Sequence, residues 1–187
     1  MSEATFRLRW RKISRRIRVP LGFLFVIFYF WLARPTLYSL LMSLILVVPG
    51  ILLRGYASGY VKKNTELAIT GPYGYTRNPL YLGSILIAFG FALAARSIWT
   101  AVALALLFLV IYGPVILDEE EFLRAKFPGY AEYARRVPRL VPRPWALQSK
   151  EKGKFSFELY LKHREYNSLL GSLCMYVLLV VRMVFTR

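Results

Sequence analysis

The chain has 187 residues, of which 57% are hydrophobic, yet its formal net charge is +16. A soluble domain of this length buries its core without apolar stretches as long as a bilayer is thick, and this chain contains several such stretches. The composition therefore argues against a soluble domain.

Residues 1–18 have the pattern of a basic amphipathic helix that lies on anionic lipid headgroups. Apolar side chains are interleaved with arginines in this stretch, namely Phe6, Leu8, Trp10, Ile13 and Ile17. A helix of this composition binds along the membrane interface. Because the basic stretch is long and no small-residue cleavage site follows the first apolar run, we expect no cleavable signal peptide.

Five apolar segments follow, and we interpret each of them as a transmembrane helix. They are Val19–Ala33, Thr36–Leu53, Leu80–Ala95, Ile98–Leu117 and Leu169–Phe185. A helix needs about 20 residues to cross the bilayer core, with roughly 17 as a lower limit. The second and fourth segments meet this length, the third is slightly short, and the first and last depend on snorkelling arginines or polar neighbours. The sequence predicts an all-α, polytopic membrane protein with about five transmembrane helices, and leaves open whether the first and last span fully.

Lysine and arginine fall mainly on one side of this topology. They crowd the stretch before the first span, the loop between spans two and three, and the segment between spans four and five. The other side holds only Arg34, Arg96 and the C-terminal arginines. The positive-inside rule then places the N-terminus and both long loops in the cytoplasm. Topology accounts for the basic charge, so we expect membrane lipids as partners and no nucleic acid.

Local signals mark the ends and the packing of these spans. Arg34-Pro35 predicts a tight turn that pairs the first two spans as a helical hairpin. Small residues in the third span predict close approach of a neighbouring helix. Gly113-Pro114 predicts a kink one turn before an acidic cluster.

Beyond the fourth span we expect an amphipathic helix, then an extended stretch between prolines, then a charged linker or surface helix. These correspond to residues 122–134, 139–141 and 146–166. We treat residues 1–187 as one membrane domain made of a basic interfacial helix, a cofactor core, and a linker with the last transmembrane helix, at 1–18, 54–142 and 145–187.

The chain has too few cysteine and histidine residues for most metal sites and catalytic triads. Cys174 is the only cysteine, which excludes an intrachain disulfide and a cysteine-cluster metal site, and we expect it to be a packing residue of the last span. His163 is the only histidine and lies in a basic loop, so we expect neither a histidine metal centre nor a serine–histidine triad. We predict no metal.

Two polar clusters lie at the ends of consecutive apolar segments. Residues Gly71–Gly83 read GPYGYTRNPLYLG and lead directly into the third span, whereas Asp118–Glu121 reads DEEE at the end of the fourth. A charge at such a position is costly unless it is paired or used. The two clusters therefore predict a site at one face of the membrane.

Three patterns between residues 54 and 142 carry a family resemblance. GPYGYTRNPLYLG contains Gly-x-Tyr followed by Arg-Asn-Pro-x-Tyr-x-Gly, Glu119-Glu120 is followed by Leu123, and FPGYAEY precedes RVP and LVP. In this order and spacing they resemble the isoprenylcysteine carboxyl methyltransferase family and its phospholipid N-methyltransferase relatives. The resemblance implies an integral membrane enzyme that uses S-adenosylmethionine.

The same resemblance implies which residues hold the cofactor and act on it. The cofactor-binding residues would be Thr65, Glu66, Leu67, Ala68, Tyr73, Asn78, Tyr81, Glu119 and Glu120, and the catalytic residues would be Glu119, Glu120 and Arg77. These residue types suit S-adenosylmethionine. Carboxylates can accept hydrogen bonds from its ribose or ammonium group, tyrosine rings can face its sulfonium cation, and groups at a helix start can meet its carboxylate.

Two positions depart from the family pattern. Asn78 stands where the family has a histidine, and asparagine can form hydrogen bonds but cannot exchange a proton near neutral pH. Val115 stands where the isoprenylcysteine branch has an arginine that holds the substrate carboxylate. The first excludes a catalytic histidine here, and the second argues against a prenylcysteine carboxylate as the substrate.

Each of these features also has a purely structural interpretation. Glu119–Glu121 could be a solvated helix end paired with Arg124 or Arg77, and the tyrosines an interfacial aromatic belt. Asn78-Pro79 could simply start a helix, and the basic stretch 135–143 could contact headgroups. Gly83 and Gly90 fit helix packing better than cofactor contact.

Together these features predict methyl transfer from S-adenosylmethionine to a lipophilic acceptor in the membrane. The alternatives are a phospholipid or other amine N-methyltransferase, an intramembrane reductase of related fold, for which the chain is short, and a non-catalytic membrane scaffold. The acceptor and the oligomeric state stay open.

Overall fold

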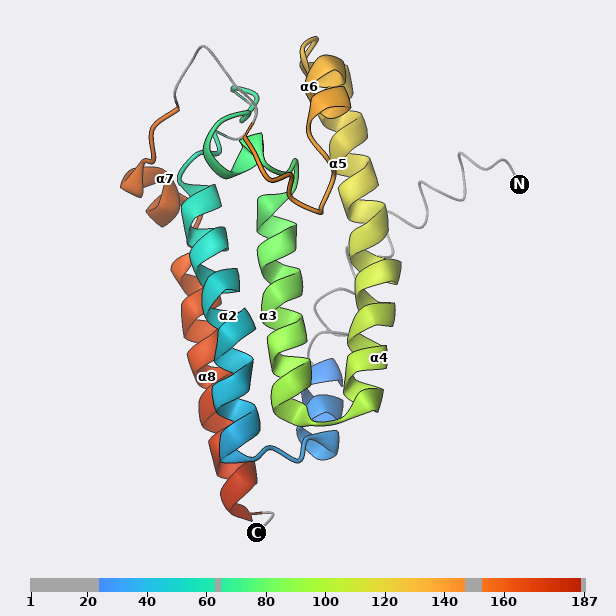
Figure 1. Cartoon of the computed structure of the whole chain (residues 1–187), viewed down its shortest axis with the longest axis vertical. Coiled ribbons are helices and arrows are strands. Elements are labelled where there is room, and N and C mark those ends of the chain that lie inside the picture. Colours follow the sequence, from blue (N-terminus) through green and yellow to red (C-terminus); the bar gives the residue numbers. More distant parts are fainter. Residues whose placement is uncertain (1–23, 63–64, 147–152, 186–187) are drawn as a thin grey trace, which may run out of the picture.

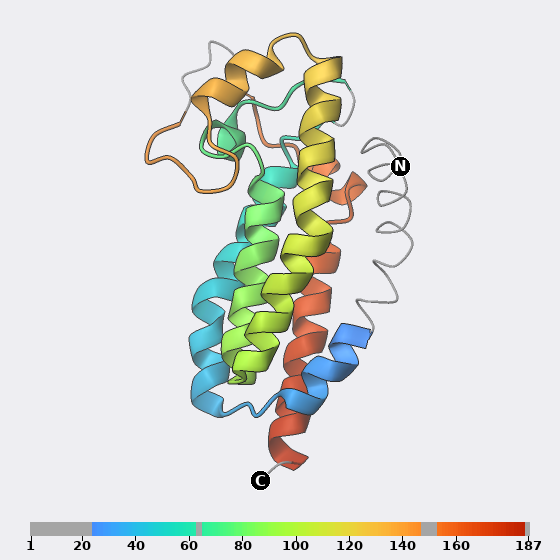
Figure 2. The ribbon, with the colours of Figure 1, turned by 90° about the vertical axis from the view of Figure 1, so that its right-hand side faces the viewer.

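The computed structural model describes residues 24–62, 65–146 and 153–185, and its secondary structure in these ranges is helical, without a β-strand (Figure 1). A helix over residues 24–32 is followed by α2 (Leu37–Ser58), α3 (Pro79–Ala95), α4 (Ile98–Leu107), α5 (Gly113–Lys126) and α8 (Tyr166–Phe185). Helices α2, α3, α4, α5 and α8 run roughly along the long axis of the molecule, whereas the helix over residues 24–32 lies obliquely to it (Figure 2). The all-α fold is therefore confirmed, whereas the interfacial helix expected at residues 1–18 lies outside the described residues.

Three helices are long and apolar enough to cross a bilayer. They are Leu37–Ser58 with 22 residues, Ile98–Lys126 with 29, and Tyr166–Phe185 with 20, and α3 is a shorter apolar helix. Their outer faces carry exposed Leu, Ile, Val and Phe side chains, as expected of surfaces in contact with lipid. The chain is thus an integral membrane protein, and the count of five spans stays a prediction because residues 19–23 are not described.

Helices α2 and α3 pack with their backbones in close approach. A Cβ atom built on Gly50 would lie 2.8 Å from the carbonyl oxygen of Gly83, and one built on Gly90 would lie 3.0 Å from that of Ser43. Cβ atoms essentially never come as close as 2.8 Å to a backbone oxygen, so glycine is required where the helices cross. Helix packing is therefore the role of Gly83 and Gly90, and the close approach predicted for the third span is confirmed.

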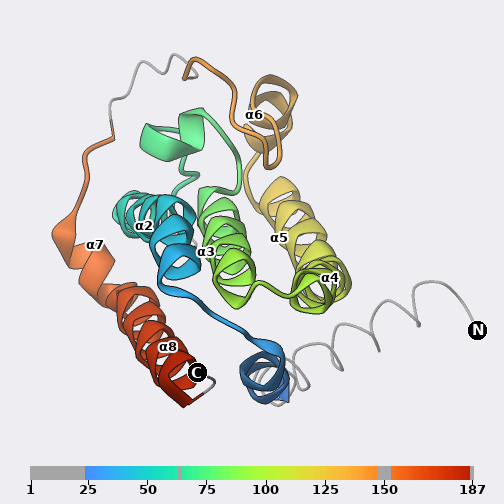
Figure 3. The same cartoon turned by 60° about the horizontal axis from the view of Figure 1, so that its bottom comes forward.

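The turn after the first helix is tied to the far end of α3. Thr36 caps α2 through a reciprocal pair of hydrogen bonds with Ser39. Ser39 also donates to the carbonyl of Ala94, and the backbone N–H of Arg34 donates to that of Ala95. These bonds fix the turn at Arg34-Pro35 against α3 at one end of the bundle. The helix over residues 24–32 lies apart from α2 (Figures 2 and 3), so the expected pairing of the first two spans as a helical hairpin is not observed.

The fourth span is one long helix with an irregular turn in its middle. Residues Phe108–Tyr112 form a π-helical turn (η2) between α4 and α5. Pro114 has no N–H to donate and its ring would clash with the carbonyl of Val110, so the helix widens ahead of it. The irregularity predicted at Gly113-Pro114 therefore takes the form of a wider turn.

At the end of the bundle opposite the Arg34 turn, short elements cover the helix ends (Figures 1 and 2). They are η1 (Gly71–Gly74), α6 (Tyr130–Arg136) and α7 (Phe157–Lys162). The single helix predicted over residues 122–134 is wrong, because α5 ends at Lys126 and α6 begins only at Tyr130. Phe127 precedes Pro128, which disfavours helical backbone, and it is extended at φ −118° and ψ 110°.

Cys174 is exposed on α8 rather than packed inside the bundle. Helix α8 contacts α2 and α3 through one side only, so that much of its surface faces outward (Figure 3). The expectation that this cysteine packs in the interior is therefore wrong.

Candidate active site

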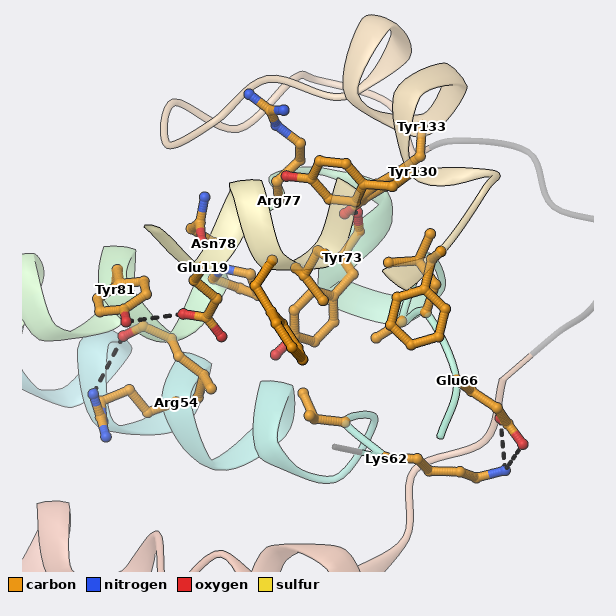
Figure 4. Close-up of a pocket in the computed structure, with 18 of the residues that line it drawn as sticks. Arg54, Lys62, Glu66, Tyr73, Arg77, Asn78, Tyr81, Glu119, Tyr130 and Tyr133 are labelled. Atoms are coloured by element: carbon orange, nitrogen blue, oxygen red, sulfur yellow. Dashed lines mark hydrogen bonds and ion pairs between the residues drawn. The ribbon is translucent and has the colours of Figure 1, made fainter. Parts of the chain in front are cut away.

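A cavity of about 500 Å³ lies among the end of α2, the start of α3, α5 and α6 (Figure 4). Aromatic and charged side chains line most of it. The lining residues are Arg54, Val61, Lys62, Glu66, Leu67, Ala68, Tyr73, Arg77, Asn78, Pro79, Leu80, Tyr81, Ser84, Tyr112, Glu119, Phe122, Leu123, Phe127, Tyr130 and Tyr133. The cavity therefore joins the two polar clusters that the sequence singled out.

Tyr81 and Glu119 connect α3 and α5 at the cavity wall. The hydroxyl of Tyr81 donates to a carboxylate oxygen of Glu119 at 3.0 Å (Figure 4). The ring of Tyr81 also packs edge-on against Tyr112, with centroids 6.0 Å apart. Tyr112, Glu119 and Phe122 lie seven and three residues apart, so they share one face of this long helix. That face presents a carboxylate bordered by aromatic rings.

Glu120 points elsewhere, because neighbouring residues on a helix are about 100° apart. It is buried, and Arg139 donates to its two carboxylate oxygens at 2.9–3.1 Å. Arg77 lies 3.3 Å from the same carboxylate, and the amide of Asn78 donates to it at 3.4 Å. The hydrogen bonds to Glu120 raise the pKa of Arg139. One buried carboxylate thus holds together the start of α3 and the chain after α6.

The chain after α6 folds back along the turn that precedes α3. The backbone N–H of Arg77 donates to the carbonyl of Pro138, and that of Arg143 to the carbonyl of Tyr75. The carbonyl of Arg139 accepts from the hydroxyl of Thr76 and from the amide of Asn78, each at 3.1 Å. Residues 138–143 therefore fix the 75–78 turn and the direction of the Asn78 side chain.

Tyr73, Tyr130 and Tyr133 form another wall of the cavity. The hydroxyl of Tyr133 donates to the carbonyl of Tyr73 at 2.8 Å, and the rings of Tyr130 and Tyr133 meet at 6.0 Å. Burial raises the pKa of all three phenols, an effect that the Arg77 cation opposes at Tyr130 and Tyr133. These groups therefore remain neutral around pH 7.

Two buried polar atoms at this wall have no hydrogen-bond partner among the described residues. They are Nε of Arg77 and the hydroxyl oxygen of Tyr130. Buried polar groups are nearly always satisfied in folded proteins, so each such atom calls for an explanation. Arg77 and Tyr130 are neighbours, and the Arg77 side chain opposes the rise in the pKa of the Tyr130 phenol through its charge and a side-chain hydrogen bond outside the usual geometric limits, so the two groups account for each other.

The remaining charges at the cavity are paired. Lys62 donates to both carboxylate oxygens of Glu66 at 2.9–3.0 Å. Arg54 donates to both carboxylate oxygens of Glu165 at 2.9–3.2 Å, and also to Ser84 and the carbonyl of Leu80. Within residues 24–62, 65–146 and 153–185, no group of three or more His, Cys, Asp and Glu side chains could hold a metal ion.

Comparison with known families decides the assignment. Residues 17–129, more than half of the chain, match the phospholipid methyltransferase family. The chain belongs to the phospholipid methyltransferase family. The resemblance drawn from the sequence is thereby confirmed, and it extends to an integral membrane methyltransferase family.

Two curated relatives of this family member are 42% identical to it over 88 residues, which is 47% of the chain. One is the cobalt-zinc-cadmium resistance protein CzcN of Cupriavidus metallidurans, and the other is the nickel-cobalt-cadmium resistance protein NccN of Alcaligenes xylosoxydans xylosoxydans. The match covers only 40% of the length of either relative. No solved structure matches the chain.

The predicted site residues of this phospholipid methyltransferase family member gather at the cavity, with two exceptions. Thr65 and Glu120 are not among the lining residues; the hydroxyl of Thr65 donates to the carbonyl of Lys62 instead. Their roles stay predictions, as do those of the lining residues.

Sequence reasoning missed Arg54, Tyr112 and Arg139. Arg54 could have been found because it is a charge directly after an apolar span, and Tyr112 because it precedes Glu119 by two helical turns. Arg139 had no such signal, since its place depends on how the chain folds back after α6.

Proposed function

We propose that this protein transfers a methyl group from S-adenosylmethionine to a lipophilic acceptor held in the membrane. The observation that carries the proposal is the Tyr81–Glu119 pair in an aromatic cavity of a member of the phospholipid methyltransferase family. By the positive-inside rule this cavity would face the cytoplasm.

In this proposal the residues of the cavity bind and orient the two reactants. Bound S-adenosylmethionine would supply an electrophilic methyl group on a sulfonium centre. Glu119, oriented by Tyr81, would accept hydrogen bonds from its ribose or ammonium group. The tyrosine rings that line the cavity would face the sulfonium cation and exclude water. Alignment in a dry site supplies most of the rate enhancement.

An amine acceptor is favoured over a carboxylate acceptor. Both arginines at the cavity are already paired with carboxylates, Arg54 with Glu165 and Arg77 with Glu120, and Val115 replaces the family's carboxylate-binding arginine. A protonated amine must lose a proton before it attacks. Of the two carboxylates that line the cavity, Glu66 is paired with Lys62, which leaves Glu119 to take the proton. Glu120, the other predicted base, is occupied by Arg77 and Arg139. The acceptor would enter from the bilayer, since the apolar spans surround the cavity's membrane side.

Isothermal titration with S-adenosylhomocysteine in detergent tests the cofactor part. We expect binding to the wild type and at least a tenfold loss of affinity in Glu119→Ala, because a charge-assisted hydrogen bond contributes about 1.5–3 kcal/mol. Glu132→Ala is the matched control, since Glu132 is an exposed carboxylate on α6 that is not among the residues lining the cavity. Absence of binding to the wild type would refute the methyltransferase proposal.

Radiolabelled methyl transfer into a native membrane lipid extract tests the reaction, and mass spectrometry identifies the product. A methylated amine lipid would support the amine acceptor, and a methyl ester would support a carboxylate acceptor. Binding of S-adenosylhomocysteine without any transfer would favour the non-catalytic scaffold instead.

A further inference from the structure

A second pocket, of about 550 Å³, lies at the end of the bundle opposite the candidate active site. It is lined by the turn before α2, the turn between α3 and α4, and the last turn of α8, which come together at this end (Figures 1 and 3). The lining residues are Arg34, Pro35, Thr36, Leu37, Arg96, Arg182 and Met183. Three arginines from three separate elements thus meet at one place.

The backbone holds two of these arginines side by side. The N–H of Arg34 donates to the carbonyl of Ala95 at 2.9 Å, which places Arg34 against the residue that precedes Arg96. Arg182 reaches the same turn from α8, where its guanidinium donates to the carbonyls of Trp31 and Ala33. Hydrogen bonds to backbone groups of the two turns therefore hold these three residues near one another.

The charges of Arg34 and Arg96 are not balanced by a carboxylate within the described part of the chain. None of the lining residues is acidic, and the side chains of Arg34 and Arg96 form no hydrogen bond or ion pair within the described part of the chain. The start of α2 lies in the same lining, and its N-terminal end adds a positive partial charge. Three arginines line one pocket that has no acidic residue in its lining, so the pocket is complementary to an anion.

The backbone conformation of Arg96 is unusual for a residue with a side chain. It ends α3 in the left-handed conformation, with φ at 52°. Glycine fits this conformation without strain, whereas an L-residue with a Cβ does not. An arginine at this position is therefore less favourable for the turn than glycine would be.

The position of the pocket relates it to the membrane. Helix α2 has 22 residues, or about 33 Å at the usual rise, and it begins at this pocket. The hydrocarbon core of a bilayer is about 30 Å thick. The pocket and the candidate active site therefore lie at opposite membrane faces, and the pocket is at the depth of lipid headgroups.

We propose that Arg34, Arg96 and Arg182 form a binding site for an anionic phosphate group. The depth of the pocket makes the headgroup of an anionic phospholipid one source of this group, and inorganic phosphate is the other. The site binds by charge-assisted hydrogen bonds from guanidinium to phosphate oxygens, the interaction for which arginine is best suited.

The test measures thermal unfolding of the full chain in a neutral detergent as ligands are added. The ligands are phosphatidylglycerol, phosphatidylcholine and sodium phosphate, and the variants are Arg34→Gln and Arg96→Gly. Arg135→Gln is the matched control, because Arg135 is an exposed arginine on α6 at the other end of the bundle. A ligand that binds only the folded state raises the unfolding temperature.

We expect phosphatidylglycerol to raise the unfolding temperature of the wild type and of Arg135→Gln. The concentration giving half of this effect should rise about fivefold with each arginine removed from the pocket. Arg96→Gly relieves the strained turn, so without ligand it should unfold no earlier than the wild type, and its weaker response cannot come from misfolding. Sodium phosphate with the same arginine dependence would identify the soluble anion as the source, and no response to it would identify the lipid.

Three results would overturn the proposal. They are no response of the wild type to either anion, an equal response to zwitterionic phosphatidylcholine, and an undiminished response in both pocket variants.

Discussion

The hydroxyl of Tyr81 on α3 donates to the carboxylate of Glu119 on α5 at 3.0 Å, whereas the next residue, Glu120, turns away to Arg77 and Arg139. Two adjacent glutamates therefore have different surroundings. Glu119 borders the cavity and is exposed, and Glu120 is buried in an ion-pair cluster. Substitutions at the two positions should consequently affect different properties.

Tyr81→Phe should weaken binding of S-adenosylhomocysteine by about tenfold, because the hydrogen bond that orients the charged Glu119 is lost, at a cost of about 1.5 kcal/mol. The unfolding temperature should change little, since the phenyl ring still packs against Tyr112. Titration calorimetry measures the affinity. Tyr38→Phe removes an exposed hydroxyl on α2 and is the control. Equal affinity of Tyr81→Phe and the wild type would contradict a role of this pair in binding.

Glu120→Ala should lower the free energy of unfolding by about 3–5 kcal/mol, because it leaves two guanidinium groups without their buried partner. Arg77 is itself almost fully buried, at 11% side-chain exposure, so water cannot replace the lost carboxylate. Glu119→Ala should change the same quantity by less than about 1 kcal/mol. Denaturant unfolding in detergent micelles compares the two variants, and equal destabilisation would show that Glu120 is not the structural member of the pair.

Gly50→Ala should destabilise the protein by about 1–3 kcal/mol, because the new methyl group would lie 2.8 Å from the backbone oxygen of Gly83 and the helices must move apart. Gly171→Ala is the matched control. Its Cβ would meet nothing within 4 Å, so the substitution should stabilise α8 by about 0.5–1 kcal/mol. Opposite shifts in the unfolding temperature are expected, and a loss of stability in both variants would mean that helix crossing is not the cause.

Much of the fold could be predicted from the sequence, because the apolar runs and the turn residues act locally. The length of α2, the turn at Arg34-Pro35 and the irregular turn before Pro114 each follow from a few neighbouring residues, whereas the direction in which the first helix leaves that turn does not. The break between α5 and α6 was missed, although Pro128 is a local signal for it. The apolar pattern of residues 122–134 outweighed that signal in our prediction.

Only part of the candidate site could be predicted from the sequence, because its geometry depends on contacts between distant segments. The sequence brought Tyr81 and Glu119 into one site but could not distinguish Glu119 from Glu120, since this depends on where α3 lies beside α5. The role of Arg139 depends on a chain reversal after α6 that no local pattern specifies. The headgroup contact that the sequence suggests for the basic stretch 135–143 stays a prediction, whereas Arg139 within it binds the buried carboxylate of Glu120.

Tyr133→Phe should change how stability depends on alkaline pH. Burial raises the pKa of Tyr133 above the value of about 10 expected in the unfolded chain. The folded state therefore favours the neutral phenol. The resulting contribution to the free energy of unfolding is complete below pH ~10 and is lost as the pH rises toward the folded-state pKa.

The free energy of unfolding of Tyr133→Phe should be about 1 kcal/mol lower than that of the wild type at pH 7, because the carbonyl of Tyr73 loses its donor. Above pH ~10 its stability should fall less steeply than that of the wild type, by up to about 1.4 kcal/mol per pH unit. Denaturant unfolding between neutral and strongly alkaline pH measures both effects, and parallel curves for the two proteins would show that Tyr133 does not carry this pH dependence.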